Sequence, residues 1–126
     1  MSKPLGGVVV SHGELAGAFV DAVHRITGQD GVLAAVTNVG CSRDTLRARL
    51  ATVLSNGPAV VFVDMPAGSC LQAAVAEVQS RADVWVVAGV NLPMLLDFVY
   101  HRELSPAEAA QRAVTHGSEA IQTFPR

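Results

Sequence analysis

The chain has 126 residues, of which 50% are hydrophobic and 16% are charged, and its formal net charge is −2. This length fits one domain with a sizeable core, while the absence of any Lys/Arg run excludes a basic nucleic-acid-binding patch. The longest apolar runs are too short for a membrane span or a secretory signal segment. Cys41 and Cys70 match no zinc or disulfide spacing, and two free thiols are typical of a reducing compartment such as the cytoplasm.

The first half of the chain has the pattern of two strand–helix pairs. Residues 5–11 and 32–37 are apolar runs of strand length, and residues 14–27 have helical spacing and end at Gly28. Cys41-Ser42 begin a second helix. The expected apolar faces are Leu15, Phe19, Val23 and Ile26 in the first helix, and Leu46, Leu50, Val53 and Leu54 in the second.

The second half continues the same alternation. Strands are expected at residues 59–64 and 84–88, with a helix at 69–80 between them and another at 91–101. Ser105, Pro106 and Glu108 form a capping-box signature that begins a last helix running towards Gln122. The third helix is expected to bury Leu71, Ala74, Val75 and Val78.

Four short apolar strands separated by helices predict an α/β fold with a doubly wound parallel sheet. In a flavodoxin-like strand order, 2-1-3-4, strands one and three are neighbours and their helices leave on opposite faces. Residues 121–124 have mild strand character and predict an added edge strand, in this chain's own sheet or in a partner's.

His12 and Asp64 follow the first and third strands, so they are expected to meet at the carboxyl edge of the sheet, where α/β folds bind ligands. A carboxylate on one ring nitrogen of a histidine fixes its tautomer and orientation. It also stabilises the positive charge that develops on the ring during nucleophilic attack. The pair therefore suits a phosphoryl acceptor, with His12 as nucleophile and Asp64 as its orienting partner.

Gly68 and Ser69 lie at the start of the third helix, where backbone N–H groups and a hydroxyl can hold phosphate oxygens. Gly13, beside His12, joins them as a predicted phosphate-binding residue. No Walker lysine motif is present, which argues against nucleotide-dependent transfer. Each residue also has a structural alternative: His12 as a polar cap of its strand, Asp64 as a loop carboxylate, and Gly68-Ser69 as an ordinary helix start. A further alternative for the site as a whole is a non-catalytic pocket that binds an anion.

The remaining polar candidates have simpler structural interpretations. His24, His101 and His116 are expected at the surface. Cys70 lies at a helix N-terminus, where a thiol pKa can fall, but no base is identified for it, so it is interpreted as a small packing residue. The basic side chains of the second helix are expected to form a solvated face: Arg43, Arg47 and Arg49.

Three stretches resemble the IIA component of the mannose-type sugar phosphotransferase system: VVVSHG at 8–13, VDMPAGS at 63–69 and AGVNLPML at 88–95. The resemblance covers nearly the whole chain and implies one IIA-type domain over residues 1–126. This sequence departs from the better-known family members in the second loop. There Met65-Pro66-Ala67 replaces a Thr-Trp-Gly type of sequence, and Cys70 replaces a proline. In the family this Trp faces the partner protein, so its loss is expected to change the surface that binds the partner and not the phosphorylation itself.

The resemblance implies a cytoplasmic phosphotransferase that needs no cofactor and no metal. His12 would accept a phosphoryl group from the phosphocarrier HPr, paired with Asp64, and pass it to a IIB component. Gly68 and Ser69 would receive the phosphate oxygens. Relatives form homodimers by exchanging C-terminal strands, here residues 121–124. Related branches serve regulatory relays or phosphorylate a dihydroxyacetone kinase instead of a transporter component, and both remain alternatives.

Overall fold

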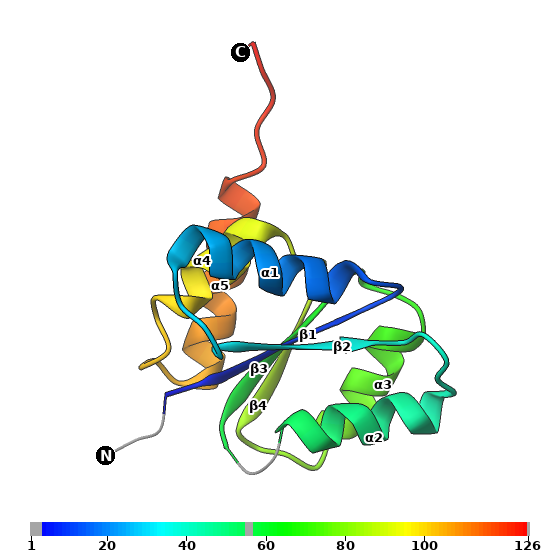
Figure 1. Ribbon diagram of the computed structural model, residues 1–126. Coiled ribbons are helices and arrows are strands. Elements are labelled where there is room, and N and C mark those ends of the chain that lie inside the picture. The colour runs from blue at the N-terminus through cyan, green and yellow to red at the C-terminus, as the bar shows by residue number, and fades with distance from the viewer. Residues whose placement is uncertain (1–3, 55–56, 126) are drawn as a thin grey trace.

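The computed structural model describes residues 4–54 and 57–125. One parallel sheet runs through the middle of the molecule in the order β2-β1-β3-β4, which confirms the expected flavodoxin-like order (Figure 1). Val10 is in register with Val36 on one side and Val63 on the other, so the three strands end at the same level. The strands are β1 (Gly6–Ser11), β2 (Leu33–Thr37), β3 (Ala59–Val63) and β4 (Val84–Ala88).

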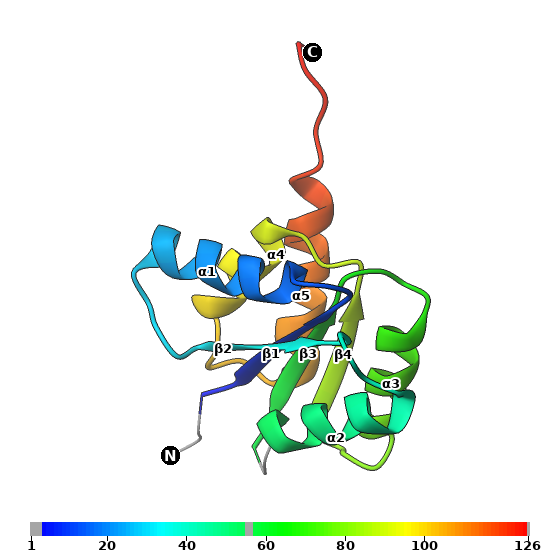
Figure 2. The same ribbon diagram turned by 45° about the vertical axis from the view of Figure 1, so that its right-hand side comes forward.

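Helices cover both faces of this sheet (Figures 1 and 2). One face carries α1 (Leu15–Thr27), α4 (Leu92–Val99) and α5 (Pro106–Glu119), and the other carries α2 (Arg43–Leu54) and α3 (Ser69–Val78). Successive β3 side chains therefore enter opposite cores, which explains why the whole strand is apolar. Within the described residues, none of these helices is long and apolar enough to cross a membrane.

Two helices, α1 and α3, face the sheet through smaller residues than expected, whereas α2 buries the expected Leu46, Leu50 and Leu54. Ala16 and Val23 are the buried residues of α1, whereas Leu15 and Ile26 are 46% and 59% exposed, so the predicted face of this helix was partly wrong. In α3 the buried residues are Cys70, Ala73 and Ala74, and Val75 is exposed. Val53 of α2 is also exposed. Small side chains let these helices approach the sheet closely, and larger ones lie at the margins.

The end of the chain differs from expectation in part. The capping box of Ser105 and Glu108 is confirmed, but α5 ends at Glu119, before Gln122. The following residues extend away from the body (Figure 1), and Phe124 is 81% exposed. Over the described part of this tail, residues 121–124 pair with none of the chain's own strands. Pairing with the sheet of a second copy stays a prediction.

A buried carboxylate joins α4 to α5. The Asp97 side chain is 3% exposed, and its Oδ1 lies 3.1 Å from Nε of Arg112. His101 Nδ1 and His116 Nδ1 lie 3.5 Å and 3.8 Å from the same oxygen. The expectation that His101 and His116 are plain surface residues was therefore incomplete, because both contact this carboxylate.

We expect Arg112→Ala to lower the free energy of unfolding by about 1–3 kcal/mol, because it removes the hydrogen-bonded cation beside a buried carboxylate. The matched control is Arg25→Ala. Arg25 pairs with Asp21 on the exposed side of α1, and such surface pairs contribute about 0.5 kcal/mol or less. Urea denaturation measures both variants, and equal losses would contradict a structural role for the Asp97 contact.

Candidate functional site

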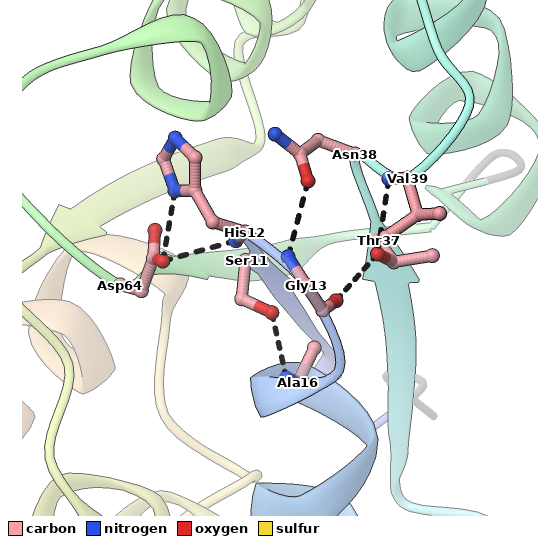
Figure 3. A network of polar contacts seen from close by, with 8 residues as sticks. All are labelled: Ser11, His12, Gly13, Ala16, Thr37, Asn38, Val39 and Asp64. Atoms are coloured by element: carbon pink, nitrogen blue, oxygen red, sulfur yellow. Dashed lines mark hydrogen bonds and ion pairs between the residues drawn. The ribbon is translucent and has the colours of Figure 1, made fainter.

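His12 and Asp64 meet where β1 and β3 end. The Asp64 backbone N–H donates to the carbonyl of Val10 at 3.2 Å, which continues the sheet ladder one residue beyond β3. Asp64 Oδ2 accepts from the backbone N–H of His12 at 3.0 Å and lies 2.9 Å from His12 Nδ1 (Figure 3). The structure thus brings together the two side chains that the sequence placed at adjacent strand ends.

This contact determines which ring nitrogen of His12 is free to react. A carboxylate accepts hydrogen bonds, so in the neutral ring Nδ1 carries the proton and Nε2 keeps its lone pair. The Asp64 side chain is 10% exposed and the His12 side chain 40%. Figure 3 shows the second ring nitrogen pointing away from Asp64. His12 can therefore present Nε2 to solvent while the buried carboxylate holds the other side of its ring.

The N-terminus of α3 lies against this free nitrogen. A Cβ placed on Gly68 would lie 3.5 Å from His12 Nε2, so the backbone before α3 passes close to the ring. Gly68 precedes the helix with φ of 93°, and no side chain caps this end. The first backbone N–H groups of a helix lack intrahelical partners and carry partial positive charge. A helix N-terminus of this kind can bind an anion, and phosphate binding by Gly68 and Ser69 stays a prediction.

Gly68→Ala should therefore weaken any reaction at Nε2. Gly68 has φ of 93° and ψ of −174°, a backbone region essentially restricted to glycine that costs other residues about 1–3 kcal/mol, and the added methyl group would occupy space beside the nucleophile. We expect a roughly tenfold slower phosphoryl transfer to His12. Gly28→Ala is the matched control, because Gly28 has φ of 72° with open space around it, far from the site. Similar slowing in both variants would contradict this role.

A set of hydrogen bonds fixes the loop that carries His12. Gly13 donates its N–H to Asn38 Oδ1 at 3.1 Å, and its carbonyl accepts from the Thr37 hydroxyl (Figure 3). The Ser11 hydroxyl accepts from the N–H of Ala16 at 2.6 Å. While the Asn38 bond is kept, the Gly13 N–H is not free for phosphate. Binding of phosphate by Gly13 stays a prediction that this bond does not favour.

The sequence analysis did not identify the residues of β2 and α2 that support the loops of the site. Thr37 ends β2 at the same sheet edge as His12, which is the signal that could have identified it. Arg49 donates to the carbonyl of Thr37 at 3.1 Å, and Arg47 Nε lies 3.4 Å from Glu77 Oε1. The expected solvated basic face holds for Arg43 and Arg49, which are exposed, although Arg49 also supports the loop beside the site; Arg47 is only half-exposed.

Cys70 lies next to the pair rather than at the surface. It is fully buried in the first turn of α3, which confirms its interpretation as a packing residue. Burial raises the pKa of its thiol, the charge of Asp64 raises it further, and a hydrogen bond with the Ser69 side chain lowers it to a smaller extent. The thiol is therefore protonated at neutral pH and is a poor nucleophile.

Several hollows of similar size lie along the described residues. One of about 370 Å³ runs beside the His12 loop and is lined by residues of that loop, α1 and β2. Another of about 400 Å³ lies at the opposite end of the strands, and neither hollow includes His12 or Asp64 in its lining. The paired polar groups favour the carboxyl edge of the sheet as the functional site.

A family model for the fructose IIA component of the phosphotransferase system, EIIA-man, matches residues 6–115. The chain belongs to this mannose-type IIA family. The matched region contains both loops of the site and ends before the exposed tail. Membership makes the chain a phosphocarrier component of the sugar phosphotransferase system, and it confirms the resemblance seen in the sequence.

Relatives of this IIA-family chain agree with the assignment. The sorbose-specific EIIA component of Klebsiella pneumoniae is 27% identical over 104 residues, which are 80% of this chain and 77% of the relative. The EIIA component of Streptococcus agalactiae superimposes with a TM-score of 0.87 at 21% identity, over 95% of this chain and 97% of that one. The mannose/sorbose-specific IIA subunit of Enterococcus faecalis has a TM-score of 0.87 at 23% identity, over 98% and 97%. At these identities the two structures support the fold.

Proposed function

We propose that this IIA-family protein accepts a phosphoryl group from phosphorylated HPr on His12 Nε2 and passes it to a IIB component in sugar uptake. The observation that carries the proposal is the orientation of one ring. Nδ1 is bound to the buried carboxylate of Asp64, and Nε2 faces the uncapped N-terminus of α3. In the cytoplasm, where HPr would be the donor, no nucleotide or metal would be needed for this transfer.

In the proposed step the lone pair of Nε2 attacks phosphorus in line. The bond from phosphorus to Nε2 of His12 forms as the phosphorus–nitrogen bond of the donor histidine breaks, and the electron pair of that bond returns to the donor ring. The His12 ring becomes positively charged while Nδ1 keeps its proton, and Asp64 stabilises that charge. The N–H groups at the start of α3 stabilise the transferring oxygens.

Exposed apolar side chains beside the site support a protein as donor. Leu15, Val39 and Met65 are 46%, 56% and 44% exposed, and each lies within three residues of His12, Asn38 or Asp64 in the chain. Aliphatic side chains around a reactive centre suit a transient protein interface. The exposed Phe124 of the tail supports the further proposal that two copies form a homodimer.

The test is to label the protein with phosphoenolpyruvate, enzyme I and HPr. We expect one phosphoryl group per chain, stable in alkali and labile in acid, mapped by mass spectrometry to His12. Phosphorylated HPr that leaves this protein unlabelled would refute the proposal and favour an anion-binding module. The labelled protein is then mixed with IIB components, with a dihydroxyacetone kinase and with regulatory proteins, and we expect the label on a IIB component.

A further inference from the structure

Three different metal-ligating side chains meet at the end of β3. The candidate ligand atoms of His12, Asp64 and Cys70 all lie within 4.8 Å of one another, and they supply one nitrogen, one oxygen and one sulfur. The phosphoryl transfer proposed above uses the first two and has no role for the third. Cys70 packs in the core, and its thiol has no part in that transfer.

A second observation points into the same cluster. Oδ1 of Asp64 is buried and has no hydrogen-bond partner among the described residues, while Oδ2 accepts both bonds from His12. A buried carboxylate oxygen without a partner is costly. Because the Asp64 side chain is 10% exposed and the His12 side chain 40%, an ion would enter from the His12 side. The cluster thus offers a cation an unused oxygen and a route from solvent.

We propose that His12, Asp64 and Cys70 form an inhibitory site for a zinc-type divalent ion. Imidazole, carboxylate and thiolate are the ligands that Zn²⁺ takes in proteins, and three of them leave its fourth position for water. Mg²⁺ and Ca²⁺ prefer oxygen ligands and would not select Cys70. With metal–ligand distances of about 2.0–2.3 Å, tetrahedral ligand atoms lie about 3.5 Å apart, so the cluster need contract by no more than about 1.3 Å.

Binding changes the ring that accepts the phosphoryl group. The Cys70 thiol loses its proton to solvent as the sulfur–metal bond forms. The Nδ1 proton of His12 passes to solvent and Nε2 takes up a proton from solvent, so Nδ1, the nitrogen that faces Asp64, gives its lone pair to the ion and Nε2 carries the single proton of the neutral ring. Nε2 has no lone pair in that tautomer and cannot attack phosphorus. This inhibition rests on the proposed function, whereas the metal binding does not.

Metal binding is tested with Co²⁺ added to the metal-free protein, because cobalt takes the zinc geometry and reports a thiolate ligand by a near-ultraviolet charge-transfer band. We expect the band in the wild type and in Cys41→Ala, the matched control for the second thiol. Cys70→Ala and Cys70→Ser should lose it and bind Zn²⁺ at least tenfold more weakly in competition titrations. Thermal unfolding checks that both variants fold. A missing band in the wild type, or an unchanged one in the Cys70 variants, would overturn the site.

Inhibition is tested by adding Zn²⁺ to single-turnover transfer from phosphorylated HPr, with each variant compared with its own zinc-free rate. We expect zinc to stop labelling of the wild type and to have at least tenfold less effect on Cys70→Ala. A cobalt band with undiminished labelling in zinc would overturn the inhibitory step alone. Absence of label without any metal would instead overturn the proposed function, and the cobalt band would still decide whether the metal site exists.

Discussion

Replacing His12 by alanine is expected to abolish phosphorylation of this protein by HPr. The substitution removes Nε2, and no other described histidine lies at the N-terminus of α3 with its ring held by a carboxylate at hydrogen-bond distance. Loss of a nucleophile typically costs a factor of roughly 10³ or more. Transfer is measured with radiolabelled phosphoenolpyruvate as the label retained per chain after an alkaline quench.

The matched control is His24→Ala. His24 is also a half-exposed histidine, but its Nδ1 contacts the carbonyl of Gln29 at the far end of α1, so this variant should label fully. His12 follows the end of β1 and its side chain is 40% exposed, so we expect His12→Ala to stay folded. Alkali-stable label that persists in His12→Ala would mean that another residue is the acceptor.

The strand order of the sheet and the pairing of His12 with Asp64 could be predicted, because both follow from features that are directly visible in the sequence. Continuous apolar runs such as 60–63 indicate strands buried on both faces, and helices between them require parallel pairing. The strand order then brings the ends of β1 and β3 together, so His12 and Asp64 had to be neighbours. Residues that directly follow a buried strand have little positional freedom, and this made the site predictable.

Other contacts depend on the geometry of loops and on the packing between helices, and the hydrophobic periodicity of the sequence predicts neither. Asn38 holds Gly13 because the chain turns directly after β2, at the same edge as His12. Asp97 meets Arg112 because α4 and α5 pack against each other. The exposed Leu15 shows the same limit, because helical spacing does not tell which of two adjacent apolar stripes faces the sheet.

Asp64→Asn is expected to slow phosphoryl transfer to His12 by about 10²–10⁴-fold. Asparagine has the shape of aspartate, so packing is preserved, but the negative charge that stabilises the attacking ring is lost. Its amide can also donate to Nδ1, and the ring then carries its proton on Nε2, where no lone pair remains for attack. Both effects act in the same direction. The backbone N–H of His12 bonds to the same Oδ2 position, so it loses its acceptor when the amide nitrogen takes that place, and we expect a loss of about 1–3 kcal/mol in the free energy of unfolding.

The variant separates the positioning role of Asp64 from a purely structural one. Rapid-quench transfer from phosphorylated HPr gives the rate, and ¹⁵N chemical shifts of the His12 ring report which nitrogen carries the proton. We expect Nδ1–H in the wild type and a shift towards Nε2–H in Asp64→Asn, with an unfolding temperature that is lower but still well above that of the assay. Asp21→Asn, which changes an exposed carboxylate paired with Arg25, should alter neither readout. A wild-type rate in Asp64→Asn would show that the charge of Asp64 has no part in the transfer, because the ring would then accept phosphate without it.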